Sequence, residues 1–251
     1  MTNDRRARAS RAEQAYRERE LAARRQRLAL TAGAVAGVVL VVAALGWFLS
    51  RGSADEAQGP APEIVQPRNV AVGEPIGFAF EGTVPLEAGA PSVEVYADFL
   101  CPHCADFEES TGERLRALAN AGEINLRFVP MTILDGRAKQ GPAHDVMNTA
   151  VCAADAAGPA AFWQVHEALF AAGYATEGER PSKDELLEVA REAGVGGLDE
   201  CVAQGRFVGW LDVPREAARD RGVTGTPSVF VDGTKVEDPT TKKVEAAIDA
   251  A

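Results

Sequence analysis

The chain is poor in cysteine and in aromatic residues, and each shortage limits what it can be. Its 251 residues hold four cysteines, none before residue 101, and a single C-x-x-C pair, Cys101 and Cys104. A zinc site would need two further ligands, and no second C-x-x-C is present, so no metal is expected. Aromatic residues make up 6 %, which predicts a core of mostly Ala, Val and Leu. There is no phosphate-binding loop, because Gly194 to Gly197 reads only as a turn.

Positive charge is scarce outside the N-terminus. The net charge is −11, yet residues 1–27 hold nine arginines against four acidic residues, a local charge of +5. The rest of the chain therefore carries −16. Nucleic-acid-binding domains need a basic surface, so an acidic domain of this size argues against nucleic acid as a partner.

A long uncharged run follows the basic segment. Residues 28–50 contain no charged side chain, and about 20 such residues span the hydrocarbon core of a bilayer. Arginines precede the run and Trp47 and Phe48 lie near its end, as in a single membrane-spanning helix with its basic side in the cytoplasm. We therefore expect residues 1–27 to be cytoplasmic, residues 51–74 to be a flexible linker and residues 75–251 to lie outside the cell membrane. A cleaved signal peptide is the alternative, for which the run is long.

The C-x-x-C pair lies where a strand meets a helix. The β-forming residues of Val93–Phe99 lead directly to Cys101, and acidic residues follow as in the first turns of a helix. At a helix N-terminus, unpaired N–H groups stabilise a thiolate, so Cys101 is the expected nucleophile, exposed at the helix end. Cys104, one turn further, is the expected buried resolving thiol. A plain structural disulfide or half of a zinc site are the alternatives.

The two residues between the cysteines suit this chemistry. Pro102 fits the first helical position, which needs no N–H donor. His103 is expected to favour the Cys101 thiolate by charge or hydrogen bonding, which would stabilise the reduced form and make the protein an oxidant. The alternative is that His103 is merely exposed on the first turn.

The order of the expected elements indicates an α/β fold. Strands on either side of a helix predict a βαβ unit, and a helical block before the last strand predicts an insertion. The expected strands are 76–80, 93–99, 124–130 and 228–232, and the expected helices are 101–121, 143–157, 160–172, 183–193, 207–221 and 240–251.

Three further features bear on the site. Thr226-Pro227 precedes a strand, and the local sequence leaves a cis or a trans peptide bond open. A cis bond would expose the Thr226 backbone edge to an extended substrate. Cys152 and Cys201 are expected to form a structural disulfide, with free buried thiols or a redox relay as alternatives. His144 and His166 lie in expected helices and are given no role.

Two segments together resemble the DsbA-type branch of the thioredoxin superfamily. They are Asp98-Phe-Leu-Cys-Pro-His-Cys104 and Val223-Thr-Gly-Thr-Pro-Ser-Val-Phe-Val-Asp-Gly233, and the likeness covers residues 75–251. It implies a thioredoxin fold with a helical insertion at about residues 138–222, a cis Pro227 beside the active-site disulfide, and no cofactor. It also implies a thiol oxidase for secreted proteins with cysteine pairs, reoxidised by a membrane partner of the DsbB or vitamin-K-epoxide-reductase type.

The chain departs from that pattern in two ways. Thioredoxin-like proteins often carry a buried acid six residues before the first cysteine, where this chain has Val95. Glu94 and Asp98 are close in sequence but are expected to point elsewhere, since side chains alternate along a strand. The membrane anchor is the second departure. Alternative functions are a membrane-tethered thiol reductase or isomerase, for instance in cytochrome maturation, or a non-catalytic chaperone or binding module on a thioredoxin scaffold.

Overall fold

The computed structural model describes residues 64–70, 76–136, 140–177 and 180–251. The expected membrane-spanning segment 28–50 and the basic segment 1–27 lie outside these ranges. Within them, no helix is long and apolar enough to cross a membrane.

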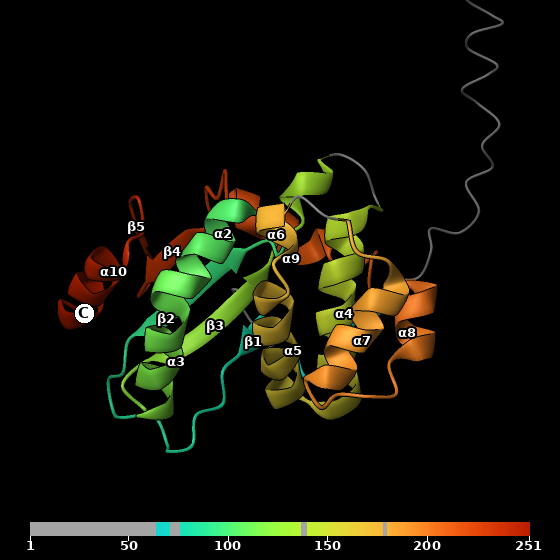
Figure 1. The fold of residues 1–251 in the computed structure, drawn as a ribbon. Helices are drawn as coiled ribbons and strands as arrows, with labels where there is room; N and C mark the ends of the chain where they lie inside the picture. The colour runs from blue at the N-terminus through green and yellow to red at the C-terminus, as the bar shows by residue number, and fades with distance from the viewer. Residues whose placement is uncertain (1–63, 71–75, 137–139, 178–179) are drawn as a thin grey trace, which may run out of the picture. The chain divides into compact units, whose positions relative to one another are not determined.

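Five strands form one mixed sheet in the described part of the chain, in the order β1-β3-β2-β4-β5 (Figure 1). β2 and β3 run parallel because a helix crosses between them, while β1, β4 and β5 pair antiparallel with their neighbours. The strands are β1 (Phe78–Ala79), β2 (Ser92–Ala97), β3 (Asn125–Pro130), β4 (Ser228–Val231) and β5 (Thr234–Val236).

β5 is a strand that the sequence did not predict. It follows β4 through Asp232 and Gly233, whose φ angles of 44° and 74° are both positive, as a two-residue hairpin loop requires. The Asp-Gly turn was expected, but three residues with two exposed side chains give no pattern from which to predict the strand.

Helices cover both faces of the sheet, so β2 is buried almost throughout. Val93, Val95 and Ala97 belong to the main core, whereas Tyr96 packs in a smaller core with Phe230 and Ala218 of α9. The helices are α2 (Pro102–Phe107), α3 (Glu113–Asn120), α4 (Pro142–Ala157), α5 (Pro159–Ala171), α6 (Tyr174–Glu177), α7 (Lys183–Glu192), α8 (Asp199–Gln204), α9 (Asp212–Asp220) and α10 (Thr241–Asp249).

The helical pattern agrees with expectation in its long elements and differs in its short ones. The expected helix 101–121 is one continuous run, but a π-helical turn, η1 (Glu108–Gly112), separates α2 from α3. The expected helix 207–221 shortens to α9, because residues 206–211 form successive turns. α6 and α8 were not predicted. Ser182 caps α7 in a reciprocal capping box with Glu185, as its sequence indicates.

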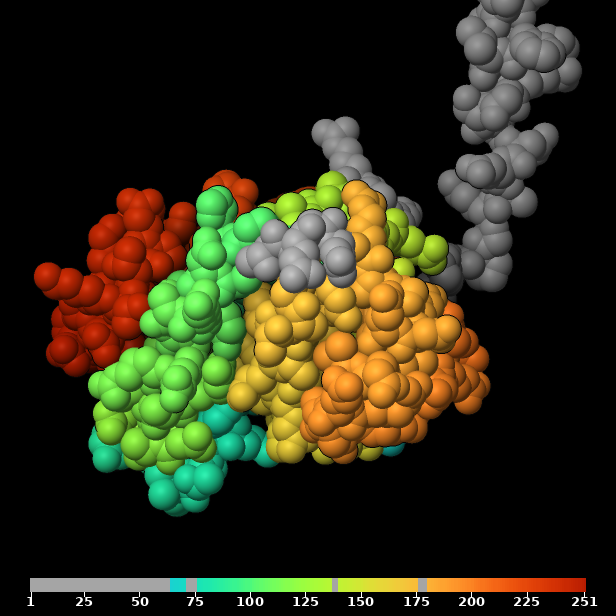
Figure 2. Space-filling view, viewed as in Figure 1, coloured from blue at the N-terminus to red at the C-terminus, as the bar shows by residue number. Residues whose placement is uncertain are grey.

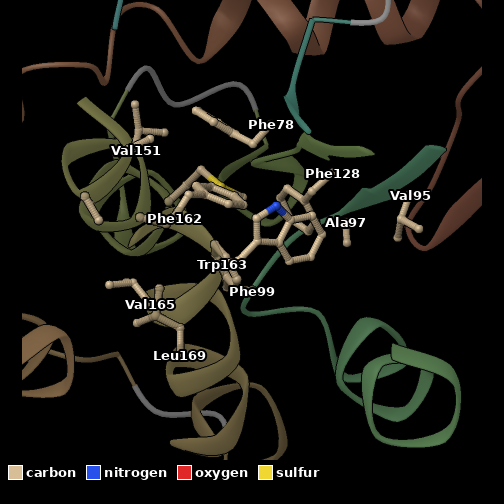
Figure 3. Close-up of a cluster of buried hydrophobic side chains, with 14 of the residues drawn as sticks. Phe78, Val95, Ala97, Phe99, Phe128, Val151, Phe162, Trp163, Val165 and Leu169 are labelled. Atoms are coloured by element: carbon tan, nitrogen blue, oxygen red, sulfur yellow. The ribbon is translucent and has the colours of Figure 1, made fainter. Parts of the chain in front are cut away.

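Aromatic rings fill the seam between the sheet and the helical insertion (Figure 3). Phe78 of β1 stacks on Phe162 of α5 with ring centroids 4.1 Å apart, and Phe128 of β3 lies 5.5 Å from the same ring. The Trp163 Nε1–H donates to the Ala79 carbonyl at 3.0 Å. Most buried hydrophobic residues of the described chain are Ala, Val or Leu, as expected, and the few large rings gather at this seam, where they bridge the sheet and α5 (Figure 3).

The folded domain begins before residue 75. The Arg68 side chain and backbone N–H bind Asp155 at the end of α4, with distances of 2.8 to 3.1 Å. The Asn69 side-chain amide donates to the Ala154 carbonyl at 3.0 Å. Part of the segment expected to be linker thus lies against α4, and we call residues 64–70 the N-terminal strap.

Helices α2 and α3 and the helical insertion form neighbouring parts of one surface. In Figure 2, the ridge of α2 and α3 (green) lies beside the insertion (yellow to orange). The Arg116 Nε of α3 lies 3.1 Å from a Glu167 carboxylate oxygen of α5, and this ion pair joins the two.

Candidate active site

The cysteine pair lies at the point where β2 passes into α2. β2 ends at Ala97, and a tight turn follows in which the Cys101 N–H donates to the Asp98 carbonyl at 3.0 Å. Cys101 occupies the N-cap of α2 with extended backbone angles, and Pro102 takes the first helical position. Cys104 follows one turn later, its N–H bonded to the Cys101 carbonyl at 3.0 Å. Both thiols are free in this structure.

Both cysteines are buried, which corrects the expectation of an exposed Cys101. Cys101 is 6 % exposed and Cys104 is 1 % exposed. The cover over Cys101 includes the loop before β4, where the Cys101 Sγ lies 3.5 Å from the Thr226 carbonyl oxygen. The Thr226–Pro227 bond in that loop is cis. The loop therefore places Thr226 and Pro227 directly over the first cysteine.

The surroundings of the pair favour a thiolate on Cys101. The hydrogen bond from the Cys104 thiol lowers the pKa of Cys101 to about 5, against the opposing effect of burial. The backbone N–H groups of Cys104 and His103 contribute in the same direction, as expected at a helix N-terminus. Burial and the neighbouring Cys101 raise the pKa of Cys104 far above its ordinary value. These surroundings thus favour a thiolate on Cys101 and a protonated thiol on Cys104.

The His103 ring lies away from the thiols. Its side chain is 84 % exposed, and its Nδ1 lies 3.9 Å from the Asp106 carboxylate. The contribution of His103 to the Cys101 thiolate comes from its backbone N–H.

A buried carboxyl group that the sequence did not predict lies behind the pair. Asp98 is fully buried, and its carboxylate accepts hydrogen bonds from the Leu100 N–H at 3.0 Å and the Leu134 N–H at 3.1 Å. Burial raises the pKa of Asp98 to about 6, and the negative charges of Cys101 and Asp135 act in the same direction. The strand alternation that argued against such a group stops at Ala97, because β2 ends there and the chain turns.

Glu94, a second buried carboxylate, has different hydrogen-bond partners from Asp98. It is also buried, at 6 % exposure, but the Arg221 guanidinium lies 2.6 Å from its carboxylate and the Tyr96 hydroxyl donates to it at 3.0 Å. Glu94 therefore has a cation beside it on the α9 side of the sheet, whereas the bonds to the Asp98 carboxylate come from two neutral backbone donors.

A second group of polar side chains lies where α2 ends and η1 begins, around the Glu108 carboxylate. Although burial acts in the opposite direction, His166 and Arg116 lower the pKa of Glu108 to about 2. The His166 Nε2 lies 3.3 Å from the Glu108 carboxylate. A Cβ added to Gly112 would lie 2.3 Å from Glu108 Oε1, so the glycine leaves room for this carboxylate. His166 was given no role from sequence; here it joins the insertion to η1.

The remaining two cysteines form a disulfide between α4 and α8. Cys152 and Cys201 are 49 residues apart in sequence, and their Cα atoms lie 6.0 Å apart. Among the residues with described positions, no group of three or more His, Cys, Asp or Glu side chains could hold a metal ion.

A strand-turn-helix dithiol, a cis-proline loop facing it and a mixed five-stranded sheet together define a protein of the thioredoxin class. The family model described as thioredoxin matches residues 87–250, and the chain belongs to this family.

Solved structures of similar proteins agree with this assignment. The disulfide bond oxidoreductase DsbG of Mycobacterium tuberculosis is 29 % identical, with a TM-score of 0.55 over 67 % of this chain and 83 % of that one. Reduced DsbA from the same organism is 29 % identical, with a TM-score of 0.59 over 69 % and 91 %. MdbA of Actinomyces oris, at 23 % identity and a TM-score of 0.60 over 74 % and 92 %, supports the fold.

One curated relative is much longer than this chain. The Na(+)/H(+) antiporter NhaA 3 of Salinispora tropica is 31 % identical over 158 residues, which is 62 % of this chain and 22 % of the antiporter. The chain thus spans about a fifth of that relative's length. Together with the activated cysteine pair, the matches to DsbA and DsbG identify the chain as a thiol-disulfide oxidoreductase.

Proposed function

We propose that this protein is a membrane-tethered disulfide oxidase that introduces disulfides into secreted proteins. The observation that carries the direction of the reaction is the low pKa of Cys101, about 5. A stabilised thiolate stabilises the reduced enzyme, and an enzyme whose reduced form is stabilised passes its disulfide to others. The acidic domain and the uncharged segment 28–50 after a basic N-terminus support an extracytoplasmic location.

The reaction begins with the oxidised pair. A substrate thiolate attacks the Cys101 Sγ, the Cys101–Cys104 bond breaks, and Cys104 leaves with the bonding electrons and takes up a proton. Its raised pKa makes protonation favourable. Asp98, buried behind the pair with a pKa of about 6, is placed to exchange this proton near neutral pH.

A second substrate thiolate completes the transfer. It attacks the substrate sulfur of the mixed disulfide, and Cys101 leaves as a thiolate. The substrate gains a disulfide, and the enzyme retains two electrons and the proton on Cys104. A membrane partner of the DsbB or vitamin-K-epoxide-reductase type then accepts those electrons. The cis loop at Thr226 and Pro227 offers a backbone edge beside Cys101 on which an extended substrate can pair.

The reduction potential of the full-length protein in detergent, equilibrated against glutathione, tests the direction. A value near or above about −180 mV supports the oxidase, and a value near about −270 mV would make the protein a tethered reductase. Protease digestion of intact cells, with detection of the C-terminal domain, tests its location. If a Cys101→Ala variant kept the cellular role, the protein would instead be a chaperone or binding module.

A further inference from the structure

A loop behind the cysteine pair supplies one of the two donors to Asp98. Residues 131–136 follow β3 and include the short 3-10 turn η2 (Ile133–Asp135). The loop begins with the Met131 N–H bonded to the Ala97 carbonyl at 3.0 Å, next to the end of β2. Its Leu134 N–H donates to Asp98 Oδ2 at 3.1 Å. The position of this loop therefore decides whether that bond forms.

Two side chains hold the loop on α4. Asp135 Oδ2 accepts hydrogen bonds from the His144 backbone N–H at 2.9 Å and from the His144 Nδ1 at 2.6 Å. Its other oxygen accepts from the Ala143 N–H at 3.3 Å. The N-cap of α4 is Gly141, which has no side chain to offer, so Asp135 satisfies N–H groups of the first turn in its place.

The His144 ring holds both ends of the segment that carries the donor. His144 is fully buried, and while its Nδ1 bonds Asp135, its Nε2 lies 3.2 Å from the Thr132 hydroxyl. Thr132 and Asp135 bracket residues 133 and 134. The carboxylate of Asp135 alone would be enough to cap α4. The His144 ring does more, because it contacts residues on both sides of Leu134, namely Thr132 and Asp135.

Among the described residues, other charged groups near the loop have partners of their own. Arg215 of α9 donates to the Gly136 carbonyl at 3.2 Å and pairs with Asp212 on its own helix. On the side of α2, Asp98 interacts electrostatically with Cys101. On α4, the next residue, Asp145, lies 3.8 Å from Lys183 and is turned toward α7.

We infer that Asp135 and His144 are positioning residues for the redox pair, which hold the Leu134 N–H on the Asp98 carboxylate behind Cys101. The inference rests on the proposed redox function of that pair. A hydrogen bond from an N–H group favours the charged form of a carboxyl group, so loosening the loop makes Asp98 harder to ionise. The charge on Asp98 acts in turn on the Cys101 thiolate, so the reactivity of Cys101 reports the state of the loop.

The test is the pH dependence of Cys101 alkylation by iodoacetamide in the reduced full-length protein. We expect a main inflection at about pH 5 from Cys101 and a smaller one at about pH 6 from Asp98. Because a hydrogen bond to a charged group is lost, His144→Leu should move the smaller inflection upward by about one pH unit. His144→Asn keeps a donor near the Nδ1 position but has no group to reach Thr132, so it should give a smaller upward shift than His144→Leu. Asp98→Asn should remove the smaller inflection.

Asn148→Leu is the matched control. Asn148 is also fully buried on α4, one turn beyond His144, but its side chain accepts from the Phe207 N–H at 2.9 Å, away from the loop. The Asn148→Leu substitution should lower the free energy of unfolding and leave both inflections of the alkylation curve in place. A His144→Leu curve that matches wild type, or an equal shift in Asn148→Leu, overturns the inference. Loss of the main inflection from wild-type protein would instead overturn the proposed function.

A second measurement does not depend on the folding of any variant. In wild-type protein, the NMR shift of the Leu134 amide proton should follow a titration at about pH 6, because that proton is bonded to the titrating carboxylate of Asp98. An amide shift that does not change through this range overturns the inference even if His144→Leu cannot be purified.

Discussion

The two cysteine pairs of this protein have the same side chains but differ in their state: one is a pair of free thiols and the other is a disulfide. Cys101 and Cys104 lie within one helical turn, surrounded by hydrogen-bond donors that stabilise a thiolate on the first of them. Cys152 and Cys201 join two helices of the insertion, with Cys152 1 % exposed in the main core. The reactivity of a cysteine pair is therefore set by the donors placed around it, and burial alone does not distinguish them, because both pairs are largely buried.

The largest contrast should come from removing one sulfur of the first pair. Cys101→Ser should lower the rate of disulfide transfer to a reduced peptide by at least about a thousandfold, because the attacked sulfur is gone. The matched control is Cys152→Ser together with Cys201→Ser, which should transfer at nearly the wild-type rate. Substantial transfer by Cys101→Ser would show that the wrong pair has been assigned.

The second pair should matter for stability. Replacing Cys152 and Cys201 by alanine should lower the free energy of unfolding by about 3–4 kcal/mol, since the disulfide closes a long loop in the unfolded chain. Urea denaturation of both proteins measures this. A large loss of transfer activity in the folded double variant would instead make this disulfide a redox relay.

The two pairs should also affect stability with opposite signs when they are reduced. The Cys101 thiol loses its proton at about pH 5 in the folded protein, against 9.0 for an ordinary thiol. Between these values the folded reduced protein binds fewer protons than the unfolded one, so its stability rises with pH. At pH 7 the protein with Cys101 and Cys104 reduced should be more stable than the oxidised protein. This advantage should disappear as the pH falls through about 5. Equal denaturation midpoints at pH 7 would contradict the thiolate assignment.

Asp98 should show the reverse pH dependence. Its pKa in the folded protein, about 6, is higher than the ordinary 3.8, so its contribution is most favourable at low pH and is lost as the pH rises through 6. The stability of Asp98→Asn relative to wild type should therefore increase by about 2 kcal/mol between pH 4 and pH 7. Glu94→Gln is the control: it removes the negative charge beside the Arg221 guanidinium and should be destabilising at pH 7. A constant difference for Asp98→Asn would show that the carboxyl group is not perturbed.

The smallest effect should come from His103. Its ring is 84 % exposed, and exposed charges contribute little, so His103→Ala should change the alkylation rate of Cys101 by less than about threefold at pH 7. A tenfold decrease would restore the view, taken from the sequence, that the imidazole itself stabilises the thiolate.

Local sequence was sufficient for the features that depend on neighbours in the chain. The strand before Cys101, the helix after it and the capping box at Ser182 follow from propensity and spacing. Two features could not be predicted from neighbouring residues alone. The pairing of Cys152 with Cys201 was predicted from the number of cysteines, and the cis bond at Pro227 from the resemblance to a family.

The features that sequence could not supply depend on contacts between distant segments. Asp98 has its buried, hydrogen-bonded position because β2 ends at Ala97 and because residue 134 brings a donor to it. His144 looked like any helical histidine until the loop after β3 was placed against it. The burial of Cys101 likewise depends on Thr226, 125 residues away.

The N-terminal strap and the loop behind Cys101 bind opposite ends of α4. The last turn of this 16-residue helix binds Arg68 and Asn69, and its first turn holds the loop behind Cys101, about 24 Å away at 1.5 Å per residue. A pull on the chain before residue 64 would therefore act on the C-terminal end of α4, at the opposite end of the helix from the loop behind Cys101. Close to that loaded end, the bond from Cys152 to Cys201 clamps α4 to α8. In the proposed membrane-tethered protein, a pull on the chain would act first at this end of α4, which is opposite to the end that contacts the loop behind Cys101.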